Sequence, residues 1–192
     1  RLSTGQTTDA FLGSDTMIED FGGYNARVSE TKWTFNGTRN MLLPFYNHND
    51  LTLSDEYKDP TGFRYVAFTG QGGCFPDVRW QLRKVHVVSG VPLFASHPVS
   101  RRVFLFDAQT NTIAVSLIYD RKGELWKVGL LGKTHPDYQI ASNKGAGVPI
   151  DDSGTMIDVQ SKRCSTGQFK SFIDPKLNPP NFFQVQQLRS GD

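Results

Sequence analysis

Long apolar runs are absent from this sequence of 192 residues, and no segment approaches the roughly 20 apolar residues that a membrane-spanning helix needs. An excess of one charge is absent too, because 21 basic residues stand against 19 acidic ones and the net charge is only +2. Such a balance creates no field of the kind that attracts nucleic acid. We therefore predict neither a spanning helix nor a nucleic-acid partner.

Recognisable catalytic and metal-binding motifs are also missing. The four histidines lie apart in predicted turns and strands, at His48, His86, His97 and His135. None has the HExxH or HxH spacing of a metal site. There is no GxSxG elbow and no P-loop, and the "GQGG" at 70–73 reads as a flexible loop. We predict no metal, no cofactor and no enzymatic activity. An enzyme would need a convergent cluster of side chains that sequence spacing does not reveal.

Cysteine is scarce, with only Cys74 and Cys164 in the whole chain. In an oxidising compartment the two could form a disulfide that closes a loop of about 90 residues, worth roughly 4–5 kcal/mol in the chain-entropy model. Two unpaired thiols are the alternative, and the spacing does not decide between them.

Sheet-forming residues are what the sequence has in abundance. Phenylalanine and β-branched residues, separated by glycine and proline, favour strands over a helix bundle. Asn36-Gly37 predicts a hairpin turn within 32–45. Further strands are predicted at 63–68, 77–88, 99–107, 112–120, 124–131 and 155–164, with a bulge or a strong bend near Arg83-Lys84.

The short connections between these strands require antiparallel neighbours. The sequence therefore predicts a mainly β fold, a strongly curved antiparallel sheet with little helix and a short helical turn after Asp15. Residues 133–154 are predicted as loop and 165–192 as an irregular tail. The chain is expected to be a single domain, 1–192, or one part of a larger domain.

Aromatic and basic residues supply the candidate ligand-binding set. A curved antiparallel sheet can hold an apolar ligand in its hollow, and the predicted wall consists of Trp33, Trp80, Phe104, Phe106, Val115 and Trp126. Arg101 and Arg102 are adjacent on a strand, so one of them must share the face of Phe104 and could meet a polar head group. Core packing of the aromatics and an arginine salt bridge to Asp120, or to another carboxylate at the sheet edge, are the structural alternatives.

Several segments together resemble one known family. They include "MIEDFGGYNARVSETKWTFNGTRNMLLPFYN", "PDVRWQLRKVHVVSG", "SRRVFLFDAQTNTIAVSLIYDRKGELWKV" and "IDVQSKR". In order, over about residues 15 to 165, they are similar to the domain of unknown function 1329 family of the Gram-negative envelope. The resemblance implies that this chain is the C-terminal half of a longer protein, whose missing half would pair with an exposed sheet edge.

That family is similar in architecture to the lipoprotein-sorting proteins LolA and LolB, which are half-open antiparallel barrels. The resemblance implies a periplasmic or outer-membrane-associated protein that carries or sorts a hydrophobic cargo, either a lipid or a lipidated protein. The alternative is an assembly subunit of an envelope complex that docks another protein, or the missing N-terminal half, through its sheet edges. Bound lipid would favour the first function, and a stable heteromeric complex would favour the second.

Overall fold

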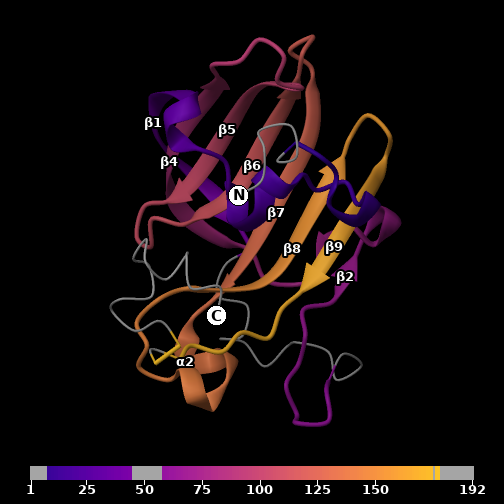
Figure 1. Cartoon of the computed structure of the whole chain (residues 1–192). Coiled ribbons are helices and arrows are strands. Elements are labelled where there is room, and N and C mark those ends of the chain that lie inside the picture. The colour runs from indigo at the N-terminus through magenta and orange to yellow at the C-terminus, as the bar shows by residue number, and fades with distance from the viewer. Residues whose placement is uncertain (1–7, 45–57, 175, 178–192) are drawn as a thin grey trace, which may run out of the picture.

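Seven antiparallel strands form one strongly twisted sheet in the computed structural model, which describes residues 8–44, 58–174 and 176–177 (Figure 1). The strand order is β1-β4-β5-β6-β7-β8-β9, and the strands are β1 Thr31–Leu43, β4 Gln81–Pro92, β5 Val99–Asp107, β6 Ile113–Asp120, β7 Leu125–Thr134, β8 Ile150–Asp158 and β9 Arg163–Gln168. A separate short pair joins β2 Phe68–Thr69 to β3 Phe75–Pro76. The prediction of a mainly β, antiparallel fold is confirmed.

Helical structure in the described residues is limited to short turns. They are α2 Pro136–Gln139 and the 3-10 turns η1 Phe11–Gly13, η2 Ile18–Gly23, η3 Val28–Glu30, η6 Gln71–Gly73 and η7 Ala141–Asn143. The expected turn after Asp15 is present as η2. The expectation of little helix is therefore confirmed.

The predicted hairpin at Asn36-Gly37 is wrong. β1 runs without a turn through both residues and pairs with β4 from Thr31–Pro92 to Leu43–Gln81. The register shifts between Phe35 and Thr38, and Gly37 has a φ of 91°, so the turn-forming dipeptide makes a bulge. The bulge that we predicted on β4 near Arg83 is absent, because the register runs unbroken from Thr38–His86 to Leu43–Gln81, and the observed bulge lies on β1 opposite Val88 and His86.

Other predicted boundaries also shift. The predicted strand at 63–68 is reduced to the short β2, and the predicted strand at 77–88 begins at Gln81. The predicted strand at 155–164 is two strands, β8 and β9, and β8 begins inside the predicted loop of 133–154. Because β9 continues to Gln168, the irregular tail starts after that residue and not at 165.

The two faces of the sheet pack different residues. One face, called the N-terminal face here, buries Met17, Val99, Ile118 and Met156 together. The other, called the aliphatic face, buries a larger cluster made up of Leu43, Val85, Val87, Leu105, Ala114, Val115 and Leu130. Alternation along the strands separates these two sets of side chains, and on β5 the irregularity between Val99 and Arg101 places Val99 on the face opposite Leu105.

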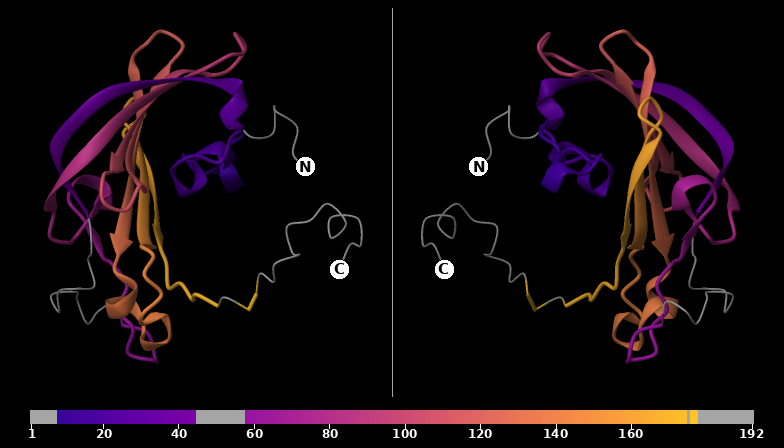
Figure 2. Two further views of the ribbon diagram at one scale, coloured as in Figure 1. Left: turned by 90° about the vertical axis from the view of Figure 1, so that its left-hand side faces the viewer. Right: turned by 90° about the vertical axis from the view of Figure 1, so that its right-hand side faces the viewer.

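Each face is covered in part by a segment from elsewhere in the chain. Residues 8–23, drawn in indigo, lie on the N-terminal face under the arched start of β1 (Figure 2). On this face, a Cβ at Gly23 would fall 2.8 Å from the Ile113 side chain, so η2 sits directly on the start of β6. The segment 58–77 packs at the β8–β9 side, where a disulfide joins Cys74 to Cys164 and the Gln168 amide donates to the Val66 carbonyl.

Candidate binding face

Adjacent arginines of β5 point to opposite faces of the sheet. Arg102 lies on the N-terminal face, where it is only 3% exposed. Its guanidinium donates to the carboxylates of Glu19 and Asp20 in η2, and the Nε–Oδ1 distance to Asp20 is 3.1 Å. Both acids are almost fully buried. Arg102 therefore anchors the N-terminal segment to the sheet, and its Nε and Nη2 donors are engaged within the protein.

The pKa values of the two acids bound by Arg102 are shifted in opposite directions from their usual values. Burial acts to raise the pKa of Glu19, but the hydrogen bond from His97 and the charge of Arg102 outweigh it and lower that pKa. The His97 Nε2 atom lies 3.2 Å from a Glu19 carboxylate oxygen. For Asp20, burial outweighs the attraction of Arg102 and raises the pKa. Glu19 is thus the more stable anion of the pair.

Aromatic rings fill the N-terminal face beside this ion cluster. Tyr24 packs edge-on against Trp33 and Phe104, with ring centroids 5.1 and 5.6 Å away. Phe104 is fully buried. The Tyr24 hydroxyl lies 2.8 Å from the Thr31 hydroxyl, and the Trp33 indole donates to the Val28 carbonyl. The rings and the N-terminal segment thus form a packed layer held by the chain itself.

The aliphatic face presents ordered rows of apolar side chains across four strands. Strand register aligns Val103, Leu117, Val128 and Ile157 in one row, which ends at Cys164. These four side chains are only partly buried and pack against the buried cluster beside them on the same face. The neighbouring row, Val87, Leu105, Val115 and Leu130, is buried. The partly buried row offers an apolar surface that continues the core toward solvent.

Arg101 marks the end of this surface where β5 begins and β6 ends. Register pairs Arg101 with Tyr119 and Tyr119 with Leu125, which is 37% exposed. The Arg101 guanidinium lies over the Tyr119 ring, with its Cζ 4.1 Å from the ring centroid. Within residues 8–44, 58–174 and 176–177 it has no ion pair. A cation thus stands free beside an apolar row.

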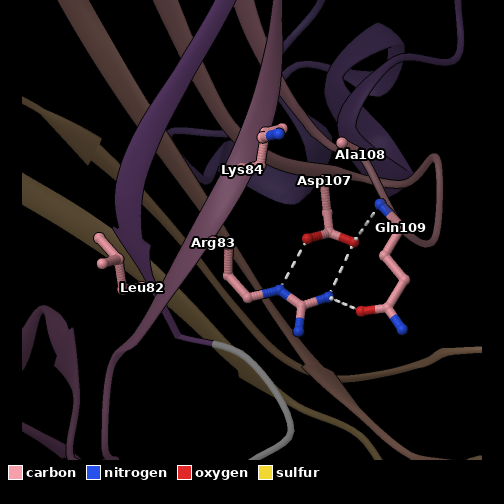
Figure 3. Close-up of a pocket in the computed structure, with 6 residues that line it drawn as sticks. All are labelled: Leu82, Arg83, Lys84, Asp107, Ala108 and Gln109. Atoms are coloured by element: carbon pink, nitrogen blue, oxygen red, sulfur yellow. Dashed lines mark hydrogen bonds and ion pairs between the residues drawn. The ribbon is translucent and has the colours of Figure 1, made fainter.

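A small open groove of about 380 Å³ lies where β4 begins and β5 ends. Figure 3 shows the Arg83 side chain turned toward the Asp107 carboxylate and the Gln109 side chain turned toward the Arg83 guanidinium, with Leu82 on the far side of β4. Arg83 binds both Asp107 oxygens, at 2.7 and 3.0 Å, and its Nη2 also donates to Gln109. These polar groups satisfy one another, so the groove is a structural junction of β4 with the turn after β5.

The predicted wall residues do not form one surface, because the sheet divides them. Trp33, Arg102, Phe104 and Phe106 share the N-terminal face, and Trp126 packs against the core of that face. Arg101 and Val115 share the aliphatic face. Trp80 precedes β4 and is 37% exposed. The expectation that one arginine shares the face of Phe104 is met by Arg102, whose partners are Glu19 and Asp20 instead of Asp120.

Sequence reasoning did not select the partly buried aliphatic row. A signal for it existed in the alternation of 101–107 and 113–119, combined with the short turn between them. With the turn at 108–112 as the pivot, Val103 and Leu117 fall opposite one another, as the register shows. The aromatic residues of β5, which the sequence analysis selected instead, lie on the opposite face.

No chemistry-bearing cluster competes with this face in the described part of the chain. Among those residues, no three His, Cys, Asp or Glu side chains come together as a metal site would require. The described helices are also all too short to span a bilayer. The partly exposed aliphatic row with its free arginine is therefore the leading candidate site.

Comparison with solved structures shows the same fold in two proteins. A domain provisionally named an outer membrane lipoprotein-sorting protein, from Vibrio parahaemolyticus, matches with a TM-score of 0.57 at 12% identity, over 97% of this chain and 59% of that one. A DUF1329 family protein from Desulfovibrio piger matches with a TM-score of 0.53 at 15% identity, over 97% and 58%. This chain thus spans somewhat under three fifths of each neighbour, and at these identities the likeness establishes the fold alone.

In sequence, nearly the whole chain matches one protein family. The family described as "Protein of unknown function (DUF1329)" matches residues 1–189. No curated protein matches the sequence.

Proposed function

This chain belongs to the DUF1329 family, and we propose that it is a non-enzymatic protein that carries or sorts a hydrophobic cargo on its aliphatic face. The cargo class is the acyl part of a lipid or of a lipidated protein. The observation that carries the proposal is the partly buried row Val103, Leu117, Val128 and Ile157, which packs against the buried cluster of the same face. The name given to the Vibrio parahaemolyticus domain, a lipoprotein-sorting protein, supports the same class.

Binding on this face would draw on the hydrophobic effect. Each Å² of apolar surface removed from water contributes roughly 25 cal/mol, so an extended acyl chain laid across four strands would gain more as it covers more of the row. The N-terminal face is a poorer candidate, because Arg102 and Phe104 are already covered by residues 8–30. Cargo could reach that face only by displacing the ion cluster.

The disulfide supports a location in the cell envelope. Disulfides persist in oxidising compartments such as the bacterial periplasm and are rare in the cytosol, and Cys74 is bonded to Cys164 in the structure. We place the protein in the periplasm or at the outer membrane of a Gram-negative bacterium.

The first test is native mass spectrometry of gently purified protein, followed by lipid extraction. A co-purifying lipid or acylated peptide is the expected result. The delipidated protein is then titrated with a fluorescent fatty acid, using Leu117→Asn and, as the matched control, Leu93→Asn. Leu93 is 62% exposed and lies in the connection after β4. Leu117→Asn should weaken binding at least fivefold and Leu93→Asn should not, whereas equal effects would contradict the proposed face.

A second candidate function is docking of another polypeptide on the sheet edge. β1 is an outer strand of 13 residues, and its Phe35 and Leu42 side chains are 63% and 59% exposed. Such an edge is a template for an added strand. This function predicts a stable heteromeric complex on size-exclusion chromatography that Phe35→Asp dissociates, with no lipid bound to the purified chain.

A further inference from the structure

We infer that the cargo carries a negative charge next to its acyl chain, and that the Arg101–Tyr119 pair binds this charge. The inference rests on the proposed function, because it places the head group of an anionic lipid relative to the aliphatic row. It concerns the chemical class of ligand, a carboxylate or phosphate attached to an acyl chain.

The state of Arg101 is the first support. Its guanidinium lies 4.1 Å from the Tyr119 ring centroid, and stacking on a ring holds a planar guanidinium while leaving its N–H edge open. That edge matches the two oxygens of a carboxylate or phosphate. Arg101 is exposed and has no ion pair in the described residues, whereas its neighbour Arg102 has two.

The nearest sequence candidate for a partner, Asp120, is already engaged. Its carboxylate accepts hydrogen bonds from the backbone N–H groups of Lys122 and Glu124, both at 2.9 Å, and from the Gln160 amide at 3.0 Å. These bonds lower the pKa of Asp120, the Gln160 bond most of all. Asp120 thus closes the turn after β6, and the positive charge of Arg101 remains available.

The position of Arg101 links its charge to the apolar row. Arg101 and Tyr119 stand opposite each other, and two residues further along the same strands Val103 stands opposite Leu117. Side chains two residues apart on a strand share a face at a spacing of about 6.8 Å. An acyl chain that lies on the row would therefore bring a carboxylate or phosphate at its end within reach of the Arg101 guanidinium.

A second cation lies on the same face. Lys32 pairs with Val91, and Val91 is one residue beyond Gly90, which pairs with Arg102. Alternation therefore places Lys32, Val91 and Arg101 on the aliphatic face at the same end of the sheet. This end of the aliphatic row carries positive charge, which complements an anionic head group and not a neutral one.

The test compares two lipids with the same acyl chain, oleate and monoolein, at concentrations below their aggregation. Dissociation constants are measured for the delipidated wild-type chain and for Arg101→Gln, Tyr119→Leu and Arg121→Gln. Arg121 is an exposed arginine in the turn after β6 and controls for general charge. Arg101→Gln should weaken oleate binding about 10-fold, which is the scale of a charge-assisted hydrogen bond. Its effect on monoolein should stay below twofold.

The remaining variants and outcomes distinguish a failure of the head-group inference from a failure of the proposed lipid binding. Tyr119→Leu should weaken oleate binding about threefold, and Arg121→Gln should leave it unchanged. Equal wild-type affinity for oleate and monoolein, or equal losses in Arg101→Gln and Arg121→Gln, would overturn the inference and leave the proposed function in place. Failure of the wild-type chain to bind either lipid would instead contradict the proposed function itself.

Discussion

Arg101 and Arg102 are the same residue type one position apart, yet the structure uses them differently. Arg102 is buried against two carboxylates and ties a distant segment to the sheet. Arg101 is exposed on a tyrosine ring beside a row of aliphatic side chains. One face of β5 thus serves stability, and in our proposal the other face serves ligand recognition.

The segments that cover the two faces differ in the same way. On the N-terminal face the covering segment is held by ion pairs and ring contacts. On the aliphatic face, the segment 58–77 is held at one side by the bond between Cys74 and Cys164, and four aliphatic side chains stay partly exposed. This difference is the reason why we propose the aliphatic face, and not the N-terminal face, as the one that takes a ligand.

Removal of the disulfide should have the largest effect on stability. The bond closes a loop with a sequence separation of 90, so Cys74→Ser with Cys164→Ser should lower the free energy of unfolding by about 4 kcal/mol. Urea denaturation of the variant and the oxidised wild type measures this. A loss below about 1 kcal/mol would mean that the segment 58–77 does not depend on the bond.

Replacement of Arg102 should have the next largest effect on stability, and it should differ clearly from the same replacement of Arg101. Arg102→Met leaves Glu19 and Asp20 buried without their cation, which should cost about 3 kcal/mol. Arg101→Met should change the free energy of unfolding by less than about 0.5 kcal/mol, as exposed substitutions usually do.

A rescue variant checks the cause of that loss. Adding Glu19→Gln and Asp20→Asn to Arg102→Met removes the unpaired charges and should recover at least half of the lost stability. If the triple variant is no more stable than Arg102→Met alone, packing and not charge is what Arg102 supplies.

Truncation of one apolar residue on each face should separate stability from binding. Phe104 is fully buried on the N-terminal face, so Phe104→Ala should cost about 3 kcal/mol and leave fatty-acid binding by the folded fraction unchanged. Leu117 is partly exposed, so Leu117→Ala should cost only about 1 kcal/mol but weaken binding severalfold. Urea titrations and fluorescent fatty-acid titrations report the two quantities, and the reverse pattern would exchange the roles of the faces.

Low pH should have the smallest effect on the free energy of unfolding. The effect should differ between Asp107 and the Arg102 cluster, which lie at opposite ends of β5. Burial acts to raise the pKa of Asp107, but the Arg83 hydrogen bond and bonds from Thr110 lower it below its usual value. An acid with a lowered folded pKa stabilises the fold above its unfolded pKa, and this stability is lost as the pH falls through the folded value. Asp107 should therefore contribute on the order of 1 kcal/mol that disappears below about pH 4.

The Arg102 cluster should respond less to acid, because its two carboxylates oppose each other. Glu19 has a lowered pKa and loses its contribution as the pH falls, whereas the raised pKa of Asp20 adds stability at low pH that is lost as the pH rises. Urea denaturation between pH 6 and pH 3 should show a shallower acid limb for Asp107→Asn than for the double variant Glu19→Gln with Asp20→Asn, which removes two opposing shifts and should keep a limb close to that of the wild type. Equal limbs would contradict this assignment.

Local signals in the sequence predicted the meander well. The runs "DAQTN" and "RKG" contain strong turn residues, and β5, β6 and β7 follow as neighbours. Asn36-Gly37 carried an equally strong turn signal that failed, since the long pairing of β1 with β4 outweighs the local preference. Long-range pairing is the information that a short window does not contain.

The site was predictable only in part for the same reason. Strand alternation correctly separates Arg101 from Arg102. Which of the two stays free depends on Glu19 and Asp20, which lie about 80 positions earlier in the chain and bind Arg102. The aromatic residues looked like a ligand wall, but Tyr24 and η2 cover Phe104 on the N-terminal face.

Photo-crosslinking with a fatty acid that carries a photoreactive group at its acyl end tests the central claim most directly. The delipidated protein is loaded, irradiated and digested, and the labelled peptides are identified by mass spectrometry. We predict label on the aliphatic row, at Val103, Leu117, Val128 or Ile157, with protection of the same sites by unlabelled oleate. Label confined to residues 8–30, or to Trp33 and Phe106, would place the ligand on the N-terminal face and contradict the account.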